Sequence, residues 1–158
     1  SSPVQYRWNV NACDDLLTLA KKVTHGHACL HHYLSLGTRQ WKTYVDGRDQ
    51  VNLKKYFYIV RPAMAIRWLR MNPGLIPPMN FYDLKQGINL PVDVMTELEV
   101  LLEKKRQSKE LGNSTRISTV DDFIASEFNW AEDAVKDGRP ENPDLREEAN
   151  ELFQKWVK

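Results

Sequence analysis

The sequence has no long hydrophobic run, few cysteines and almost no net charge. Across its 158 residues, no apolar stretch approaches the roughly 18 residues of a membrane-spanning helix, and the first residues lack the apolar core of a signal peptide. Lys and Arg number 22 against 21 Asp and Glu, a net charge of +1 that argues against a DNA-coating protein. Its two cysteines fit neither a disulfide framework nor a zinc motif, so we expect reduced thiols and a cytoplasmic location.

The motifs of several enzyme classes are also absent from the sequence. It contains no Gly-rich phosphate loop, no nucleophilic serine elbow and no DxD motif. The adjacent acidic pairs Asp14-Asp15, Asp121-Asp122 and Glu147-Glu148 suit helix starts or solvent-facing positions. Because two-metal phosphoryl transfer needs carboxylates that converge on the ions, the sequence predicts no catalytic residue in this chain.

Four histidines occur within eight residues, and two of them have a spacing found in metal-binding helices. His27 and His31 are four residues apart and would share one helix face. No acidic residue accompanies them as in an HExxH motif, and no third ligand lies nearby in the sequence. Ring stacking or packing is therefore the preferred interpretation, and no metal site is predicted.

Apolar periodicity predicts an all-α fold with no strands. Gly37 indicates close approach of another helix, Asp46-Gly47 predicts a left-handed helix end, and Ser118 with Asp121 predicts a capping box. We expect one domain over residues 1–158, an irregular bundle of about six or seven helices around a central helix over 52–70 that Pro62 kinks. The expected helices cover 13–22, 25–45, 52–70, 83–86, 91–111, 118–138 and 142 onward.

The central segment, NLKKYFYIVRPAMAIRWLR, is apolar around its circumference but carries five cations. A helix of this kind belongs inside a bundle. Each of Lys54, Lys55, Arg61, Arg67 and Arg70 must then reach solvent, pair with a carboxylate or bind an anionic ligand.

Two hypotheses explain these cations. On an ideal helix, Lys54, Tyr58 and Arg61 lie within about 40° of one line, so they would form an anion-binding face. Alternatively, the segment is a core helix whose cations pair with acids of neighbouring helices. Lys105 and Lys109 share a face near the end of the 91–111 helix and would extend a basic wall.

Several motifs together resemble one protein family. They are His32-Tyr33-Leu34-Ser35, the pattern KKYFYxxRPxxAxRW over 54–68, Pro77-Pro78-Met79-Asn80-Phe81, and Phe123-Ile124. This run is similar to the C-terminal part of predicted nucleotidyltransferases of the DNA polymerase β superfamily, the RNA repair pathway DNA polymerase beta family. The resemblance covers most of the chain.

In such proteins an α/β half with a Gly-Ser motif and metal-binding aspartates precedes a helical half. The resemblance implies that this chain is the helical C-terminal half of a longer protein, inactive alone, whose full-length enzyme uses Mg²⁺ and a nucleoside triphosphate. It implies that Lys54 and Arg61 hold phosphate oxygens, that Tyr58 or Trp68 stacks on a base, and that Arg67 pairs with an acid. The expected substrate-binding set is Lys54, Lys55, Tyr58, Arg61, Arg67, Lys105 and Lys109.

Two other functions stay open at this point. The chain would be a stand-alone helical interaction module that binds RNA or a protein partner, with RNA affinity that falls steeply with salt. It would otherwise be a scaffold whose cations form internal ion pairs. These readings differ in whether Arg61 and Arg67 face an open cavity or carboxylates.

Overall fold

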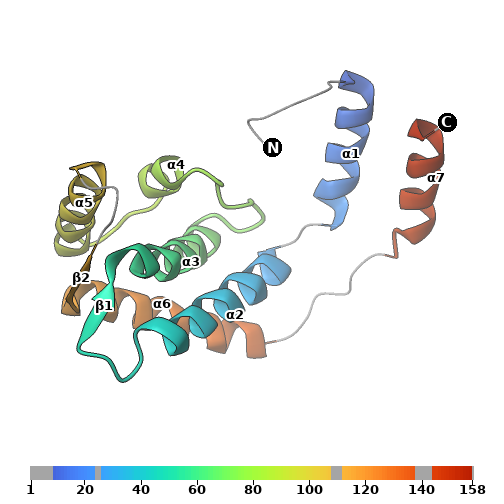
Figure 1. The fold of residues 1–158 in the computed structure, drawn as a ribbon. Coiled ribbons are helices and arrows are strands. Elements are labelled where there is room, and N and C mark those ends of the chain that lie inside the picture. Colours follow the sequence, from blue (N-terminus) through green and yellow to red (C-terminus); the bar gives the residue numbers. More distant parts are fainter. Residues whose placement is uncertain (1–8, 24–25, 108–111, 138–143, 158) are drawn as a thin grey trace. The chain divides into compact units, whose positions relative to one another are not determined.

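A computed structural model describes residues 9–23, 26–107, 112–137 and 144–157 (Figure 1). These residues form seven α-helices and one small sheet, so the prediction of an all-α fold is confirmed. The helices are α1 (Val10–Val23), α2 (Gly26–Tyr44), α3 (Leu53–Met71), α4 (Phe81–Gln86), α5 (Val92–Gln107), α6 (Ser118–Lys136) and α7 (Arg146–Trp156), and the strands are β1 (Gln50–Asn52) and β2 (Asn113–Thr115). None of these described helices has the length and hydrophobicity that crossing a membrane requires.

The chain divides into two compact units. The larger unit is Gly26–Arg139, and the smaller one joins the two ends of the chain, Ser1–His25 and Pro140–Lys158. That the whole chain acts as one domain stays a prediction.

Helix α3 is the centre of the larger unit, as the sequence predicts. Asn52 caps its start, because the Asn52 side chain accepts hydrogen bonds from the backbone N–H groups of Lys54 and Lys55 at 3.1 and 3.3 Å. α3 contacts α2, α4 and α6. Its buried residues point in every direction around the axis: Leu53, Tyr56, Phe57, Ile59, Val60, Pro62, Ala63, Met64, Ala65, Ile66 and Leu69.

Gly37 lets three helices approach one another. A Cβ atom at Gly37 of α2 would overlap the ring of Phe128 on α6 and would lie 3.2 Å from the Cβ of Pro62 on α3. The predicted close approach is therefore confirmed, and it involves α6 as well as the central helix. α3 continues as a helix through Pro62.

The small sheet is a feature that sequence analysis missed. β1 and β2 are antiparallel, with Gln50 opposite Thr115 and Asn52 opposite Asn113. Three-residue strands are too short to show a period of two in the sequence. The sheet nevertheless matters for the site, because it brings the residues that follow α5 back to the start of α3.

The predicted capping box at the start of α6 is wrong. α6 begins after Ile117 without a side-chain cap. The Asp121 carboxylate instead accepts hydrogen bonds from Arg116 Nε at 2.7 Å and from the hydroxyl of Tyr56. A charged donor and a buried hydroxyl outcompete a backbone N–H for this carboxylate. Burial and the neighbouring Asp121 raise the pKa of Tyr56, so it stays a donor.

Other helix ends follow the prediction with small corrections. Gly47 has φ of +67° and so ends the second helix as expected. α1 starts at Val10, earlier than the predicted residue 13, because the Asn9 side chain accepts a hydrogen bond from the N–H of Ala12 at 3.2 Å. The predicted start of the last helix at 142–143 and the end of the 91–111 helix lie outside the described residues.

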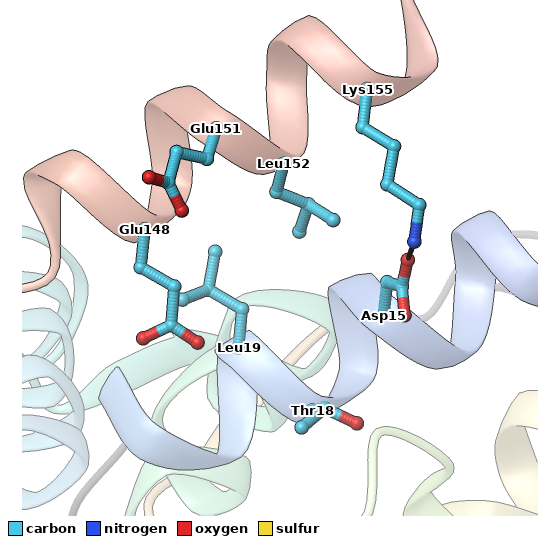
Figure 2. A pocket seen from close by; sticks show the side chains of 7 residues that line it. All are labelled: Asp15, Thr18, Leu19, Glu148, Glu151, Leu152 and Lys155. Carbon is cyan, nitrogen blue, oxygen red and sulfur yellow. Dashed lines mark hydrogen bonds and ion pairs between the residues drawn. The ribbon is translucent and has the colours of Figure 1, made fainter.

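In the smaller unit, α1 and α7 pack side by side (Figure 2). Asp15 accepts hydrogen bonds from Lys155 Nζ at 2.6 Å and Trp156 Nε1 at 3.1 Å, and these contacts hold the pKa of the Asp15 carboxyl below its usual range. Asp15 therefore links α1 to α7, whereas the sequence analysis assigned it to the start of a helix. Leu19 and Leu152 line a cavity of about 270 Å³ between the two helices.

Candidate functional site

A cavity of about 350 Å³ lies where α3, α4 and α5 meet. Three kinds of side chain line it: aromatic rings, cations and one leucine. We call it the aromatic cavity. Its lining residues are Phe57, Tyr58 and Arg61 from α3, Phe81 and Tyr82 from α4, and Leu102, Lys105 and Arg106 from α5.

Local sequence signals place each wall of the aromatic cavity. On α4, the Asn80 side chain accepts a hydrogen bond from the N–H of Tyr82 at 2.8 Å, so the cap holds Phe81 and Tyr82 in the first turn. On α5, Leu101 and Leu102 are buried. Lys105 follows one turn later on the same face and therefore points toward α3.

Four aromatic rings line the cavity, and two of them are half-exposed. Phe57 and Phe81 meet edge to face with centroids 5.9 Å apart, and Phe81 meets Tyr82 at 6.2 Å. Tyr58 and Tyr82 are each 47% exposed, unlike buried Phe57. Half-exposed rings beside a cavity offer faces on which a planar group can stack.

Arg61 and Lys105 form no ion pair with any described carboxylate. Arg61 Nη2 donates to the backbone carbonyl of Met79 at 2.8 Å. Lys105 Nζ lies 5.0 Å from the centroid of the Phe57 ring. Since none of the described lining residues is acidic, these two cations give the aromatic cavity a positive potential that suits an anion.

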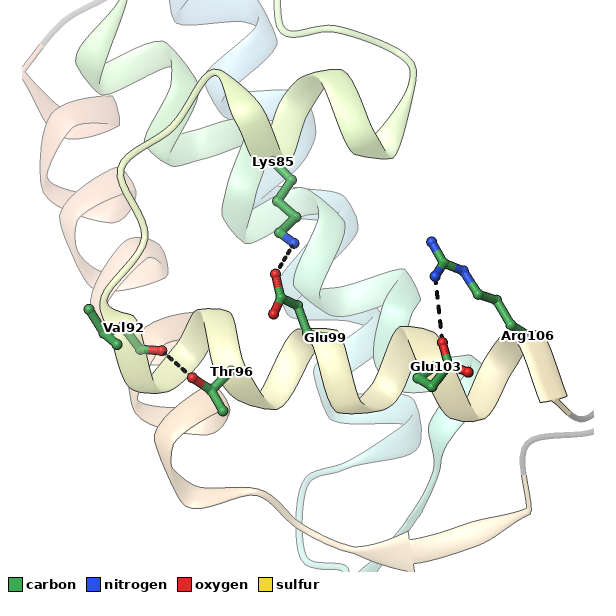
Figure 3. A network of polar contacts seen from close by, with 6 residues as sticks. All are labelled: Lys85, Val92, Thr96, Glu99, Glu103 and Arg106. Carbon is green, nitrogen blue, oxygen red and sulfur yellow. Dashed lines mark hydrogen bonds and ion pairs between the residues drawn. The ribbon is translucent and has the colours of Figure 1, made fainter.

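Arg106 differs, because it has an acidic partner. Its Nη1 lies 3.5 Å from Glu103 Oε2 on the same helix (Figure 3). A hydrogen bond with Tyr82, and then the charge of Glu103, raise the pKa of Arg106, which stays protonated. Lys85 Nζ of α4 donates a hydrogen bond to Glu99 Oε1 of α5 at 2.9 Å, and this contact links two walls of the cavity (Figure 3).

Lys54 and Lys55, both predicted to bind substrate, do not line the aromatic cavity. Lys55 Nζ lies 4.6 Å from the Tyr44 ring centroid and 5.4 Å from that of Tyr58, so it supports Tyr58 from outside. Lys54 is exposed and forms no ion pair with a described residue. Lys109, the last of the predicted set, lies outside the described residues.

Arg67 is engaged by an internal acid, as the resemblance implied. Arg70 Nη2 and Arg67 Nε lie 3.0 and 3.5 Å from Oε1 of Glu127 on α6, whose side chain is 1% exposed. Arg67 also lies 5.4 Å from the Phe123 ring. Arg67 and Arg70 thus pair with an acid of a neighbouring helix, as the second cation hypothesis predicts. Arg61 lines the cavity, and anion binding there stays a prediction.

The structure unites Tyr58, Arg61 and Lys105, and it adds five residues that sequence reasoning missed. These are Phe57, Phe81, Tyr82, Leu102 and Arg106. Phe57 and Leu102 also belong to the buried core of the larger unit. The signal for Phe81 and Tyr82 was their position directly after the Asn80 cap, beside a proline-rich link.

The histidines of α2 lie elsewhere. The His32 ring contacts Tyr33 edge to face at 5.2 Å, in line with the ring-stacking interpretation. The part of the chain that the structure describes has no group of three or more His, Cys, Asp or Glu that could hold a metal ion.

Comparison with known proteins identifies the family. Residues 1–155 match the sequence profile of the RNA repair pathway DNA polymerase beta family, RlaP. The chain belongs to this family. It is 32% identical over 157 residues to the protein named "Uncharacterized protein YcgL" of Bacillus subtilis (strain 168), an alignment that covers 99% of this chain and 60% of that protein. No solved structure matches the chain.

The RlaP assignment confirms the resemblance inferred from sequence motifs. Three residues of the aromatic cavity, Phe57, Tyr58 and Arg61, lie inside the KKYFYxxRP motif that carried that resemblance. The chain spans less than two thirds of the length of the relative from B. subtilis.

Proposed function

We propose that this RlaP chain is the helical nucleotide-binding part of a polymerase β-like nucleotidyltransferase. One observation carries the proposal: in a chain of this family, Arg61 and Lys105 face half-exposed tyrosines across a cavity and have no described carboxylate partner. Cations without a described acidic partner, beside stacking surfaces, match the two parts of a nucleotide, its phosphates and its base.

The chemistry of the aromatic cavity suits a nucleoside triphosphate. A volume of about 350 Å³ falls in the usual range of ligand sites, roughly 300–1,000 Å³. The phosphates would contact Arg61 and Lys105, with Arg106 at the edge, and the base would stack on Tyr58 or Tyr82. Guanidinium and ammonium groups would then offset the negative charge of the triphosphate and hold it in one orientation.

The chain would bind and orient, and would not complete a reaction alone. The described lining of the cavity supplies no carboxylate for Mg²⁺, so Mg²⁺ and the carboxylates that hold it would belong to another part of a longer enzyme. When bound, the metal would neutralise phosphate charge during transfer. In this proposal, the isolated chain has no transferase activity.

The alternative is a helical interaction module for RNA or a protein partner. Its RNA version predicts binding through phosphates with a steep salt dependence. The scaffold reading suits Arg67 and Arg70, which share Glu127, but it leaves the open position of Arg61 unexplained.

Calorimetric titration with a nucleoside triphosphate tests the proposal. Arg61→Ala/Lys105→Ala should weaken binding at least about tenfold, because each lost charge-assisted contact costs on the order of 1 kcal/mol. Lys136→Ala/Arg146→Ala is the matched control, since it removes two exposed cations outside the cavity. Equal affinities of the two double variants would contradict the proposal.

Tyr58→Ala separates the base from the phosphates in the same titration. Loss of one stacking surface should weaken binding of a nucleoside triphosphate by about 1–3 kcal/mol. Binding of inorganic triphosphate, which has no base, should change much less. An equal loss for both ligands would remove Tyr58 from the base-binding role.

A further inference from the structure

The positive surface of α3 extends beyond the aromatic cavity. Lys54, Tyr58 and Arg61 follow one another at spacings of four and three residues, so they lie on one face of the helix. Arg61 lines the cavity, Tyr58 is 47% exposed, and Lys54 is exposed. Seven residues of helix separate Lys54 from Arg61 by about 10 Å along the axis.

Two contacts place other parts of the chain beside this face of α3. Lys105 of α5 lies over Phe57, one residue from Tyr58. The backbone carbonyl of Gly112 accepts a hydrogen bond from the N–H of Leu53 at 3.3 Å. The chain that leaves α5 therefore returns to the first turn of α3, beside Lys54.

Tyr58 is held in position between the cavity and Lys54. Lys55 Nζ lies 5.4 Å from the Tyr58 ring centroid and donates a hydrogen bond to the Tyr44 hydroxyl at 3.4 Å. A supported ring loses less conformational entropy when a base stacks on it. This face of α3 therefore presents Lys54, the supported Tyr58 ring and Arg61 in that order along the helix.

We infer that this face of α3 binds a single-stranded nucleic acid, with one nucleotide in the aromatic cavity and the phosphate of a neighbouring nucleotide at Lys54. Cations that follow a backbone, interleaved with rings on which bases stack, are the usual basis of single-strand binding. A nucleotide confined to the cavity leaves Lys54 without a ligand, whereas a strand continues to it. The inference rests on the proposed function, because the strand uses the same cavity.

Lys54→Glu tests this inference with two ligands measured in parallel. The probes are a short fluorescein-labelled oligouridylate, followed by fluorescence anisotropy, and uridine triphosphate, followed by calorimetry. Glutamate in the first turn of a helix is favoured by the helix dipole, so the variant should fold, which circular dichroism checks. Lys136→Glu on α6 is the control, because it makes the same charge change at an exposed site.

The expected result is a selective loss of strand binding. Lys54→Glu should weaken oligouridylate binding about two- to fivefold. It should also reduce the slope of log affinity against log salt by about 0.7, the value for one phosphate contact to a single strand. Uridine triphosphate affinity should change less than twofold at about 0.15 M salt, where charges about 10 Å apart are largely screened.

The two proposals fail in different ways. Oligouridylate affinity and salt slope equal to those of Lys136→Glu would overturn the strand inference, and so would equal losses for strand and triphosphate. The proposed function is tested separately, by the effect of Arg61→Ala/Lys105→Ala on nucleoside triphosphate affinity. That experiment does not involve Lys54.

Discussion

Glu127 is the most deeply buried acidic side chain that the structure describes, and it joins α6 to α3. Its Oε1 contacts both Arg70 and Arg67. Burial disfavours its charge more than the two guanidinium groups favour it, so the pKa of Glu127 is raised above 4.5. An ion pair of this kind selects one arrangement of α3 and α6, but it adds little net stability.

The raised pKa predicts how stability depends on pH. The folded protein binds the Glu127 proton more tightly than the unfolded chain does, so this contribution is complete below the unfolded value, about 4.3. It is lost as pH rises through the higher folded-state pKa. Glu127→Gln cannot titrate, and its free energy of unfolding should therefore fall less over this window, as measured by urea denaturation at several pH values.

Glu99→Gln is the control for that experiment. Glu99 is also paired with a cation, but its side chain is 63% exposed. A change of the pH profile in Glu127→Gln that is absent from Glu99→Gln assigns the effect to the buried carboxylate. Parallel profiles for wild type and Glu127→Gln would show that Glu127 has no raised pKa.

At the scale of elements, the contact of α2 with α3 and α6 depends on the lack of a side chain at Gly37. Alanine stabilises an isolated helix relative to glycine by about 1 kcal/mol. At this position, however, the added methyl would meet the Phe128 ring, with Cε1 at 2.8 Å, and Pro62 Cβ at 3.2 Å. Overpacking and helix propensity therefore act in opposite directions.

We expect overpacking to prevail in Gly37→Ala. The variant should be destabilised by about 1–3 kcal/mol, because Pro62 and Phe128 both belong to the buried interior. Urea denaturation measures the change. Gly26→Ala, at the start of the same helix with no atom within 4 Å of the added Cβ, should be neutral or slightly stabilised. Equal stability of the two variants would contradict the close approach.

At the scale of the whole molecule, the two units differ in how much they bury. The larger unit contains the hydrophobic core around α3. None of the described residues of α1 and α7 is buried, and Leu16, Leu17 and Phe153 are 46–63% exposed. Partly exposed ion pairs link the two helices, among them Lys155 with Asp15 and Lys22 with Glu148.

This difference predicts uneven local stability. Exposed ion pairs contribute little, and helices with few buried contacts open at low free-energy cost. Native-state hydrogen exchange should show α1 and α7 amides exchanging well before those of α3 and α6. Protection of α7 equal to that of α3 would show that further contacts hold the smaller unit.

Sequence reasoning determined the features that depend on local chemistry. The period of apolar residues identified the helices, including the central one, and Gly47, with a positive φ, ends the second helix as predicted. The KKYFYxxRP motif identified the family, since a long motif is specific without knowledge of contacts. Tyr58 and Arg61 were named because cations and rings in an apolar segment need an explanation, and Lys105 because it shares a helix face with Lys109; the structure places all three on one cavity, and their role in binding stays a prediction.

Only the tertiary structure decided which cations are neutralised and which face a cavity. Arg61 and Arg67 are of the same type on the same helix, yet α6 brings Glu127 to Arg67, whereas the segment before α4 brings the neutral backbone carbonyl of Met79 to Arg61. Such partners cannot be identified from the sequence, because about 60 residues of chain separate Arg67 from Glu127. The same limit hid the pairing of β1 with β2 and the joining of Phe81, Tyr82 and Arg106 into one cavity.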